Sequence, residues 1–416
     1  MNNRKKIELL APVGNMEKLE IAIHYGADAI YLGDTRFSLR NFSGNFRLDE
    51  IPGAIALAHR HNVKLYVACN IYARSEEQDE LREYLCRLGE IEPDAVIMAD
   101  PGIIMAAREL IPEIPIHLST QANTTSILSA RFWETVGIRR IVAARELSLA
   151  EISAMVSATS LDIEAFVHGA MCISYSGRCL LSSFMAQRDS NRGMCAQPCR
   201  WKYALVEEKR PGEFMPFAED NRGSYVFNAR DLCMIDHMPA LIESGIRALK
   251  IEGRMKGINY LATTLNTYRA AIDSYYSDPA AYALKPEWIE ALASINQRGY
   301  CSGFYFGDPR QTLPDYEKTA VVSERRLVGK VTAATRSGQT PVEVRNKLFA
   351  GDAVELISAG RRDRRDVIEK IFDPNGHSLP WAQPGSRIQV VFRTDCAAND
   401  LIRSINPQES TKGTAL

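Results

Sequence analysis

The 416-residue sequence predicts an α/β protein built on a (β/α)8 TIM-like barrel. A large Cys-rich insertion follows strand seven, and a small C-terminal all-β barrel domain ends the chain. Two patterns predict this organisation. Up to about residue 255, short apolar runs alternate with amphipathic segments, which is typical of parallel strands buried on both faces and covered by helices. After about residue 325, short β-rich runs are separated only by turns.

Eight apolar runs are the predicted barrel strands. They occupy residues 7–14, 26–33, 64–70, 92–100, 116–123, 137–145, 162–169 and 245–253. The segments between them read as helices; in residues 76–90, for example, Leu81, Leu85 and Leu88 recur among charged residues. Eight β–α units fit a (β/α)8 barrel, whose active site lies where the strands end. A doubly wound open sheet is the structural alternative.

The predicted domain boundaries follow from these patterns. Residues 1–324 form the barrel, which includes the insertion at about 170–235 and a helical connector. Residues 325–404 form the small β-domain, and the polar residues 405–416 are expected to be a disordered tail.

Polar or small residues end the predicted strands, and at one face of a barrel they would form a polar mouth. They are Gly14, Gly33, Asn70, Asp100, Gln121, Arg145, Glu146, His168, Glu252 and Arg254. The insertion follows strand seven and therefore belongs to the same mouth. Loops of this length inside a compact domain are usually functional.

The insertion carries five of the nine cysteines within 62 residues, namely Cys172, Cys179, Cys195, Cys199 and Cys233. Thiolate is the preferred ligand of soft metals and of iron–sulfur clusters. Between residues 171 and 206, five Lys and Arg accompany one Asp, and such positive charge stabilises thiolates. An iron–sulfur cluster is the favoured interpretation; a structural zinc and independent buried thiols are the alternatives. The other four cysteines are isolated and are interpreted as core residues.

Composition limits the class of protein. The apolar fraction of 46% and the charged fraction of 24% are those of an ordinary globular protein. No apolar run approaches the roughly 18 residues that span a bilayer, and the N-terminal apolar stretch is too short for a signal peptide. We therefore expect a cytoplasmic protein without a membrane partner, in which clustered thiols bind metal rather than form disulfides.

The segment from Glu164 to Ser183 resembles a known family signature. "EAFVHGAMCISYSGRCLLSS" resembles the signature of the collagenase-like U-class peptidase family, number thirty-two, and the resemblance covers the whole chain. Within that family, "RDSNRGMCAQPCRWKY" and "KIEGRMK" are most similar to the branch of tRNA wobble-uridine hydroxylation proteins. The resemblance implies formation of 5-hydroxyuridine without oxygen, a [4Fe-4S] cluster, and prephenate as a co-substrate. It also implies that the cluster ligands match Cys172, Cys179, Cys195 and Cys233, with Cys199 a possible substitute for Cys195.

These roles suggest further candidate residues at the mouth. Arg178, Lys250, Arg254 and Lys256 are candidates for binding a carboxylate such as prephenate, since arginine forks suit carboxylates. His168, Glu252 and Arg254 are the candidate catalytic residues. A rim salt bridge between Glu252 and Arg254 is the structural alternative.

The tRNA anticodon loop is the expected macromolecular partner. Between residues 325 and 370, eleven Lys and Arg face six Asp and Glu, and four of these arginines lie in "GRRDRR" at 360–365. Phosphate contacts need such charges, although an Arg-rich loop can also be merely solvated. A wobble base inserted into the mouth would stack on a side chain such as Tyr175 or Phe184. Oligomeric state is not predicted.

Two other functions remain as alternatives. A peptidase is the weaker one, because the sequence has neither a G-x-S-x-G elbow nor an H-E-x-x-H pair. A cysteine nucleophile assisted by His168 would leave four clustered thiols unexplained. The other alternative is a cluster-bearing scaffold without catalysis of its own.

Overall fold

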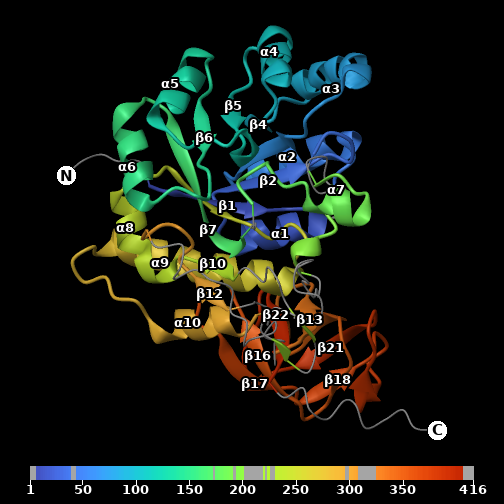
Figure 1. The fold of residues 1–416 in the computed structure, drawn as a ribbon. Coiled ribbons are helices and arrows are strands. Elements are labelled where there is room, and N and C mark those ends of the chain that lie inside the picture. Colours follow the sequence, from blue (N-terminus) through green and yellow to red (C-terminus); the bar gives the residue numbers. More distant parts are fainter. Residues whose placement is uncertain are drawn as a thin grey trace, which may run out of the picture.

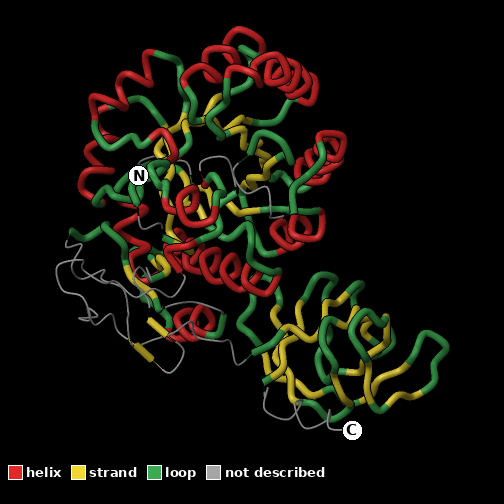
Figure 2. Tube along the Cα trace, turned by 45° about the vertical axis from the view of Figure 1, so that its right-hand side comes forward, coloured by secondary structure: helices red, strands yellow, loops and turns green. Residues whose placement is uncertain are grey.

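The computed structural model describes residues 6–38, 44–171, 174–190, 194–200, 219–220, 223–224, 230–295, 299–307 and 325–405. The larger part is a ring of strands surrounded by helices, and a strand-rich small domain lies beside it (Figures 1 and 2).

The described residues contain a closed barrel of eight parallel strands, and the predicted fold class is confirmed. The barrel strands are β1 (Glu8–Pro12), β2 (Ala29–Gly33), β3 (Lys64–Cys69), β4 (Ala95–Met98), β5 (Ile116–Leu118), β6 (Arg140–Val142), β7 (Asp162–Ala170) and β11 (Ala248–Ile251). Each pairs with the next in parallel, and β11 closes the ring by pairing with both β7 and β1. Every run predicted to be a barrel strand contains one of them, except that β7 extends one residue beyond its predicted run.

Helices connect the strands and cover the outside of the barrel. They are α1 (Met16–His24), α2 (Ile51–Arg60), α3 (Gln78–Ile91), α4 (Pro101–Leu110), α5 (Ile127–Thr135), α6 (Leu149–Ala158), α8 (Met238–Glu243) and α9 (Ile258–Ser277). Several begin at side-chain caps next to the strand ends. The Asn15 side chain accepts a hydrogen bond from the Lys18 amide at 2.9 Å, and Asp100 accepts one from the Gly102 amide at 2.7 Å. Such caps satisfy amides that have no partner inside the helix.

Strand β7 is longer than its neighbours and leads into the insertion. Its last residues pair with the antiparallel strand β10 (Asp231–Cys233), which in turn pairs with β12 (Tyr300–Cys301). The insertion also contains α7 (Leu181–Ala186) and the short strands β8 (Glu219–Asp220) and β9 (Gly223–Ser224).

The small domain is an antiparallel sheet with its own apolar core. In spatial order, its strands are β17 (Arg364–Val367), β16 (Ala353–Ile357), β22 (Leu401–Ser404), β13 (Leu327–Val331), β14 (Thr340–Val344), β21 (Arg387–Val391), β18 (Lys370–Phe372) and β19 (Ser378–Leu379). A separate pair consists of β15 (Leu348–Phe349) and β20 (Trp381–Ala382). The predicted all-β character of this domain is confirmed.

Polar contacts fix the small domain against α1, α9 and the connector helix α10 (Pro286–Ala293). The fully buried Arg403 pairs with Asp363 at 2.6 Å and donates to the Ser294 hydroxyl, just beyond α10, at 3.0 Å. The Tyr25 hydroxyl at the end of α1 donates to the Ile357 carbonyl at 2.7 Å. Because these bonds are largely buried, the two domains are held in one arrangement. No helix in the described part of the chain is long and apolar enough to cross a membrane.

Candidate functional site

A cavity of about 160 Å³ lies at the carboxyl ends of the barrel strands, under the insertion. Strand-end residues such as Asn70, Gln121 and Arg145 line it from the barrel side. Ser176, Gly177 and Leu181 line it from the insertion. The polar mouth expected from the strand ends is therefore present, and the insertion forms part of its wall.

The start of the insertion packs closely on the barrel rim. The Ser176 amide donates to Glu146 Oε1 at 2.9 Å, and the Thr120 hydroxyl donates to Ser176 Oγ at 3.2 Å. At Gly177, which has φ +75°, a Cβ atom would lie 2.4 Å from the Gln121 carbonyl oxygen. Only glycine fits both this backbone conformation and this close approach.

Cys179, Cys195 and Cys199 line the cavity, and all three are partly exposed. Hydrogen bonds tie their segments together. Ser190 Oγ donates to the Cys179 carbonyl at 2.7 Å, and the Ala196 amide donates to Ser182 Oγ at 2.9 Å. The Gln197 amide lies 3.4 Å from Cys195 Sγ and donates to it. Three thiols that line one cavity are the donor type that an iron–sulfur cluster requires, so this donor set fits such a cluster.

The other two clustered cysteines differ in position. Cys233 lies on β10 opposite His168, outside the cavity lining, and burial raises the pKa of its thiol to about 11. Cys172 lies outside the described residues. Within the described residues, no group of three or more His, Cys, Asp or Glu is placed to hold a single metal ion. In a cuboidal cluster each thiolate binds a different iron, so its ligands need not converge on one ion.

Cations outnumber carboxylates on the barrel side of the cavity. Lys250, Glu252 and Arg254 all line it, as does Arg145, whose guanidinium lies 3.6 Å from Glu252. The Arg254 side chain is buried and packs against Gly33, where a Cβ atom would lie 2.7 Å from its terminal nitrogens. The cavity therefore suits a small anion such as a carboxylate.

Besides Cys233, the predicted site residues Arg178, Lys256 and His168 do not line the cavity. Arg178 is exposed beside it, and the Lys256 ammonium lies 5.3 Å from the ring centroid of Tyr260. His168 is 1% exposed and packs among tyrosine rings, and burial lowers its pKa to about 3. Its imidazole is therefore neutral at physiological pH. The roles proposed for these residues remain predictions.

Two aromatic residues suggested for base stacking lie on the exposed face of the insertion. Tyr175 is 60% exposed and Phe184, in α7, is 81% exposed. Both are close in sequence to residues that line the cavity.

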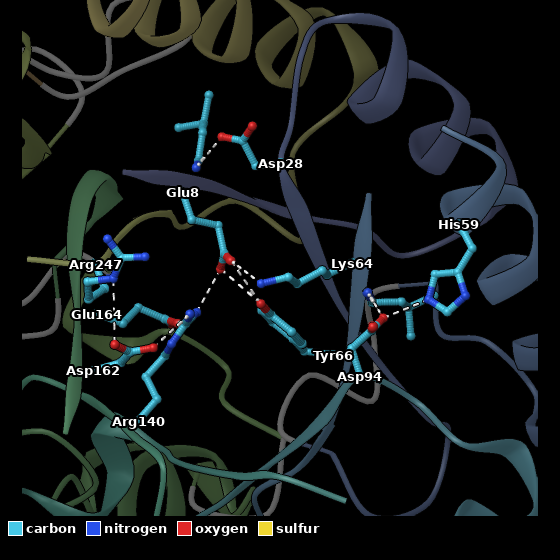
Figure 3. A network of polar contacts seen from close by, with 12 residues as sticks. Glu8, Asp28, His59, Lys64, Tyr66, Asp94, Arg140, Asp162, Glu164 and Arg247 are labelled. Atoms are coloured by element: carbon cyan, nitrogen blue, oxygen red, sulfur yellow. Dashed lines mark hydrogen bonds and ion pairs between the residues drawn. The ribbon is translucent and has the colours of Figure 1, made fainter. Parts of the chain in front are cut away.

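A buried network of charges lies inside the barrel (Figure 3). Arg140 Nη1 lies 2.7 Å from Glu8 Oε1 and 3.3 Å from Glu164 Oε2. The Lys250 ammonium lies 2.8 Å from the other oxygen of Glu164, and the Tyr66 hydroxyl donates to Glu8 at 3.0 Å. Because Lys250 also lines the cavity, this network fixes one of the cavity cations.

Replacing Arg140 with methionine is expected to lower the free energy of unfolding by about 3–5 kcal/mol at pH 7, because the buried carboxylates of Glu8 and Glu164 both lose the arginine that they share. Burial alone raises the pKa of Glu8, but Arg140, Lys64 and Tyr66 together hold it below its usual value. The stability that Glu8 contributes is therefore complete above its ordinary pKa and is lost as pH falls through the lowered value. In the Arg140→Met protein burial dominates, so acidification should stabilise rather than destabilise through this group.

Urea unfolding at pH 7 and pH 4 measures both effects. Arg139→Met, which changes the exposed neighbouring arginine, is the matched control and should differ from the wild type by less than about 0.5 kcal/mol. Equal stabilities of the two variants at pH 7 would contradict the network's role.

The arginines of the "GRRDRR" segment have different environments. Arg364 Nη2 donates to Ser358 Oγ at 3.2 Å, inside the small domain. Arg361, Arg362 and Arg365 are exposed and, with Lys285, line a groove of about 480 Å³ between the small domain and helices α9 and α10. These side chains are accessible to a polyanion.

Comparisons with known proteins identify relatives along nearly the whole chain. The chain is 39% identical to tRNA hydroxylation protein P1 of Bacillus subtilis (strain 168), over 94% of this chain and 92% of that protein. It is 36% identical to tRNA hydroxylation protein P of Escherichia coli (strain K12), over 91% and 92% of the two chains. It is also 35% identical to the Escherichia coli (strain K12) 23S rRNA 5-hydroxycytidine C2501 synthase, over 65% of this chain and 40% of that protein.

Family models divide the chain into two matched regions. Residues 14–314 match the model of peptidase family U32, and residues 323–403 match the model of the peptidase family U32 C-terminal domain. The first match covers the barrel from α1 onward together with the insertion, and the second covers the small β-domain. On these matches, the chain belongs to peptidase family U32.

Proposed function

We propose that this protein is a tRNA hydroxylation enzyme that forms 5-hydroxyuridine at the wobble position, without oxygen, using a [4Fe-4S] cluster and prephenate. The observation that carries the proposal is the joint lining of one cavity by Cys179, Cys195 and Cys199 and by the cations Arg145, Lys250 and Arg254. The names of the relatives that are 36–39% identical along more than nine-tenths of the chain support RNA as the substrate.

The proposed cluster ligands are Cys172, Cys179, Cys233 and either Cys195 or Cys199. A bound cluster would supply electron transfer, which the side chains of the protein cannot. The positive residues of the insertion would offset the negative charge of the thiolates. Cys195 and Cys199 line the same cavity, so either one is available as the third ligand.

The proposed anion site is the cation-rich side of the cavity. Arg254 would bind one carboxylate of prephenate as a fork, and Arg145 would contribute beside Glu252. Lys250 is fixed by its ion pair with Glu164, so its ammonium would stabilise the negative charge of the bound carboxylate without moving. The cavity volume of about 160 Å³ suits a small ligand, since drug-sized sites have roughly 300–1,000 Å³.

The proposed RNA contacts are the mouth and the small domain. A wobble uridine would leave the anticodon stack and enter the mouth, where Tyr175 or Phe184 would hold it by stacking. The exposed Arg361, Arg362 and Arg365 would contact phosphates, so affinity for tRNA should fall as salt increases.

The peptidase activity in the family name has less structural support. A cysteine peptidase needs an imidazole that can reach both a thiolate and the substrate. His168 is 1% exposed and lies outside the cavity lining. A scaffold without catalysis would also have no need for thiols and cations in one cavity.

Deletion of the gene is expected to remove 5-hydroxyuridine from bulk tRNA, and the wild-type gene should restore it. Quantitative nucleoside mass spectrometry of purified tRNA measures this, with an unrelated tRNA modification as internal control. Any other host enzyme that forms 5-hydroxyuridine in tRNA is deleted first, so that the measured nucleoside comes from this protein alone. Unchanged 5-hydroxyuridine in such a strain would exclude the proposed reaction.

A further inference from the structure

Two large aromatic residues are exposed next to each other on the small domain. Phe349 in β15 and Trp381 in β20 are cross-strand partners, and they are 38% and 42% exposed. Within the described residues, neither ring contacts another aromatic ring. Large apolar surface left in water on a protein often marks a binding site.

A lysine accompanies both rings. The Lys347 ammonium lies 4.9 Å from the ring centroid of Phe349 and 4.4 Å from that of Trp381. Lys347 is exposed and forms no ion pair with any residue that the structure describes. Aromatic faces together with an unpaired cation are the combination with which proteins bind single-stranded nucleic acid, because the rings stack on bases and the cation meets phosphates.

The chain places this group near the barrel mouth. Arg345, two residues before Lys347, forms an ion pair with Glu17 in the first turn of α1. That turn follows the carboxyl end of β1, and Lys18 beside Glu17 donates to the Arg254 carbonyl at 2.8 Å. Phe349 is four residues from Arg345, a span of at most about 14 Å. An RNA strand that enters the mouth can therefore reach the two rings.

Stabilisation of the β15–β20 pair is the simpler explanation for two cross-strand aromatic residues. That explanation requires contact between the rings and favours their burial. It accounts neither for the exposed fraction of each residue nor for the ammonium shared between the two rings.

We propose that Lys347, Phe349 and Trp381 form a second RNA contact, the aromatic platform, which stacks an unpaired nucleotide of the tRNA other than the one in the cavity. The inference rests on the proposed function for its choice of tRNA. The platform increases affinity for the substrate and takes no part in the chemical reaction.

Fluorescence anisotropy of labelled tRNA, titrated with the protein at several salt concentrations, tests the platform. Trp381→Ala is expected to weaken binding by about tenfold, within the range of one lost stacking contact, and to leave the salt dependence unchanged. Lys347→Glu keeps both rings; it should weaken binding and lower the slope of log affinity against log salt by at least about one. Phe132→Ala, which removes a 58% exposed aromatic ring from α5 on the other side of the barrel, is the matched control (Figure 1).

The outcomes separate the platform from the proposed function, because binding is measured without turnover. Weakened binding by the platform variants, with thermal unfolding as in the wild type, supports the platform whether or not 5-hydroxyuridine is formed. Binding by Lys347→Glu and Trp381→Ala that equals binding by Phe132→Ala overturns the platform even if the protein hydroxylates tRNA. If Trp381→Ala does not fold, Lys347→Glu alone decides in the same way.

Discussion

Replacing Cys179 with alanine is expected to remove most of the iron from protein purified without air and to abolish tRNA hydroxylation. Cys179 is partly exposed, lines the cavity and has its carbonyl fixed by Ser190 at 2.7 Å, so the backbone should keep its shape when the sulfur is lost. A four-iron cluster needs four ligands, and loss of one thiolate usually makes it labile. Activity should fall at least about 100-fold, because a lost redox centre cannot be replaced by binding energy.

Iron analysis and the visible absorption spectrum measure the first effect, and nucleoside mass spectrometry measures the second. Cys86→Ala is the matched control, since Cys86 is an exposed thiol on α3 outside the cavity lining. It should keep about four irons per chain, the content of one cluster. A wild-type protein that is colourless and holds stoichiometric zinc would overturn the redox proposal.

The same measurements identify the third ligand. Cys195 and Cys199 both line the cavity, and Cys195 Sγ accepts a hydrogen bond from the Gln197 amide at 3.4 Å. Cluster sulfurs commonly accept hydrogen bonds, so this contact favours Cys195 as the third ligand. Cys195→Ala should therefore lose iron, whereas Cys199→Ala should keep it. The reverse result would assign Cys199 instead.

The barrel could be predicted from sequence because its signal is local. Each parallel strand is buried on both faces and therefore appears as a short apolar run. The charge network inside the barrel could not be predicted, because a local signal does not reveal which distant strands lie side by side. Glu8, Arg140 and Glu164 each interrupt an apolar run, and a single charge in a strand carries no information about its partner. Their pairing depends on strand register, which aligns residues far apart in the chain.

The candidate site could be predicted in part. Lys250, Glu252 and Arg254 alternate along one strand and its extension, and all three line the cavity, as the period of two requires. His168 follows Phe166 by two residues, so a regular strand would place both side chains on the same face. Phe166 lines the cavity, but His168 does not. The pairing of β7 with β11 is irregular between Lys250 and Ile251, and the end of β7 turns to pair with β10. Such an irregularity depends on tertiary pairing and leaves no pattern in the sequence.

Replacing Arg254 with alanine is expected to weaken prephenate binding by about 100-fold or more and to lower hydroxylation correspondingly at limiting prephenate. The Arg254 side chain is 3% exposed and packs against Gly33, so a carboxylate bound by it would be shielded from water. A charge-assisted hydrogen bond contributes about 1.5–3 kcal/mol, and a fork forms two such bonds. Arg254→Lys keeps the charge without the fork and should recover only part of the affinity.

Isothermal titration of the cluster-loaded protein with prephenate measures this effect, and Arg178→Ala is the matched control. Arg178 is an exposed arginine of the same mouth that does not line the cavity, so its loss should change the affinity less than about threefold, the range of a screened surface charge. The contrast between the two arginines separates a bound anion from general attraction to a positive mouth. If Arg178→Ala loses as much affinity as Arg254→Ala, the anion binds outside the cavity and the assignment of Arg254 fails. If only Arg254→Ala loses affinity while the cluster remains intact, the metabolite and the thiols share one cavity.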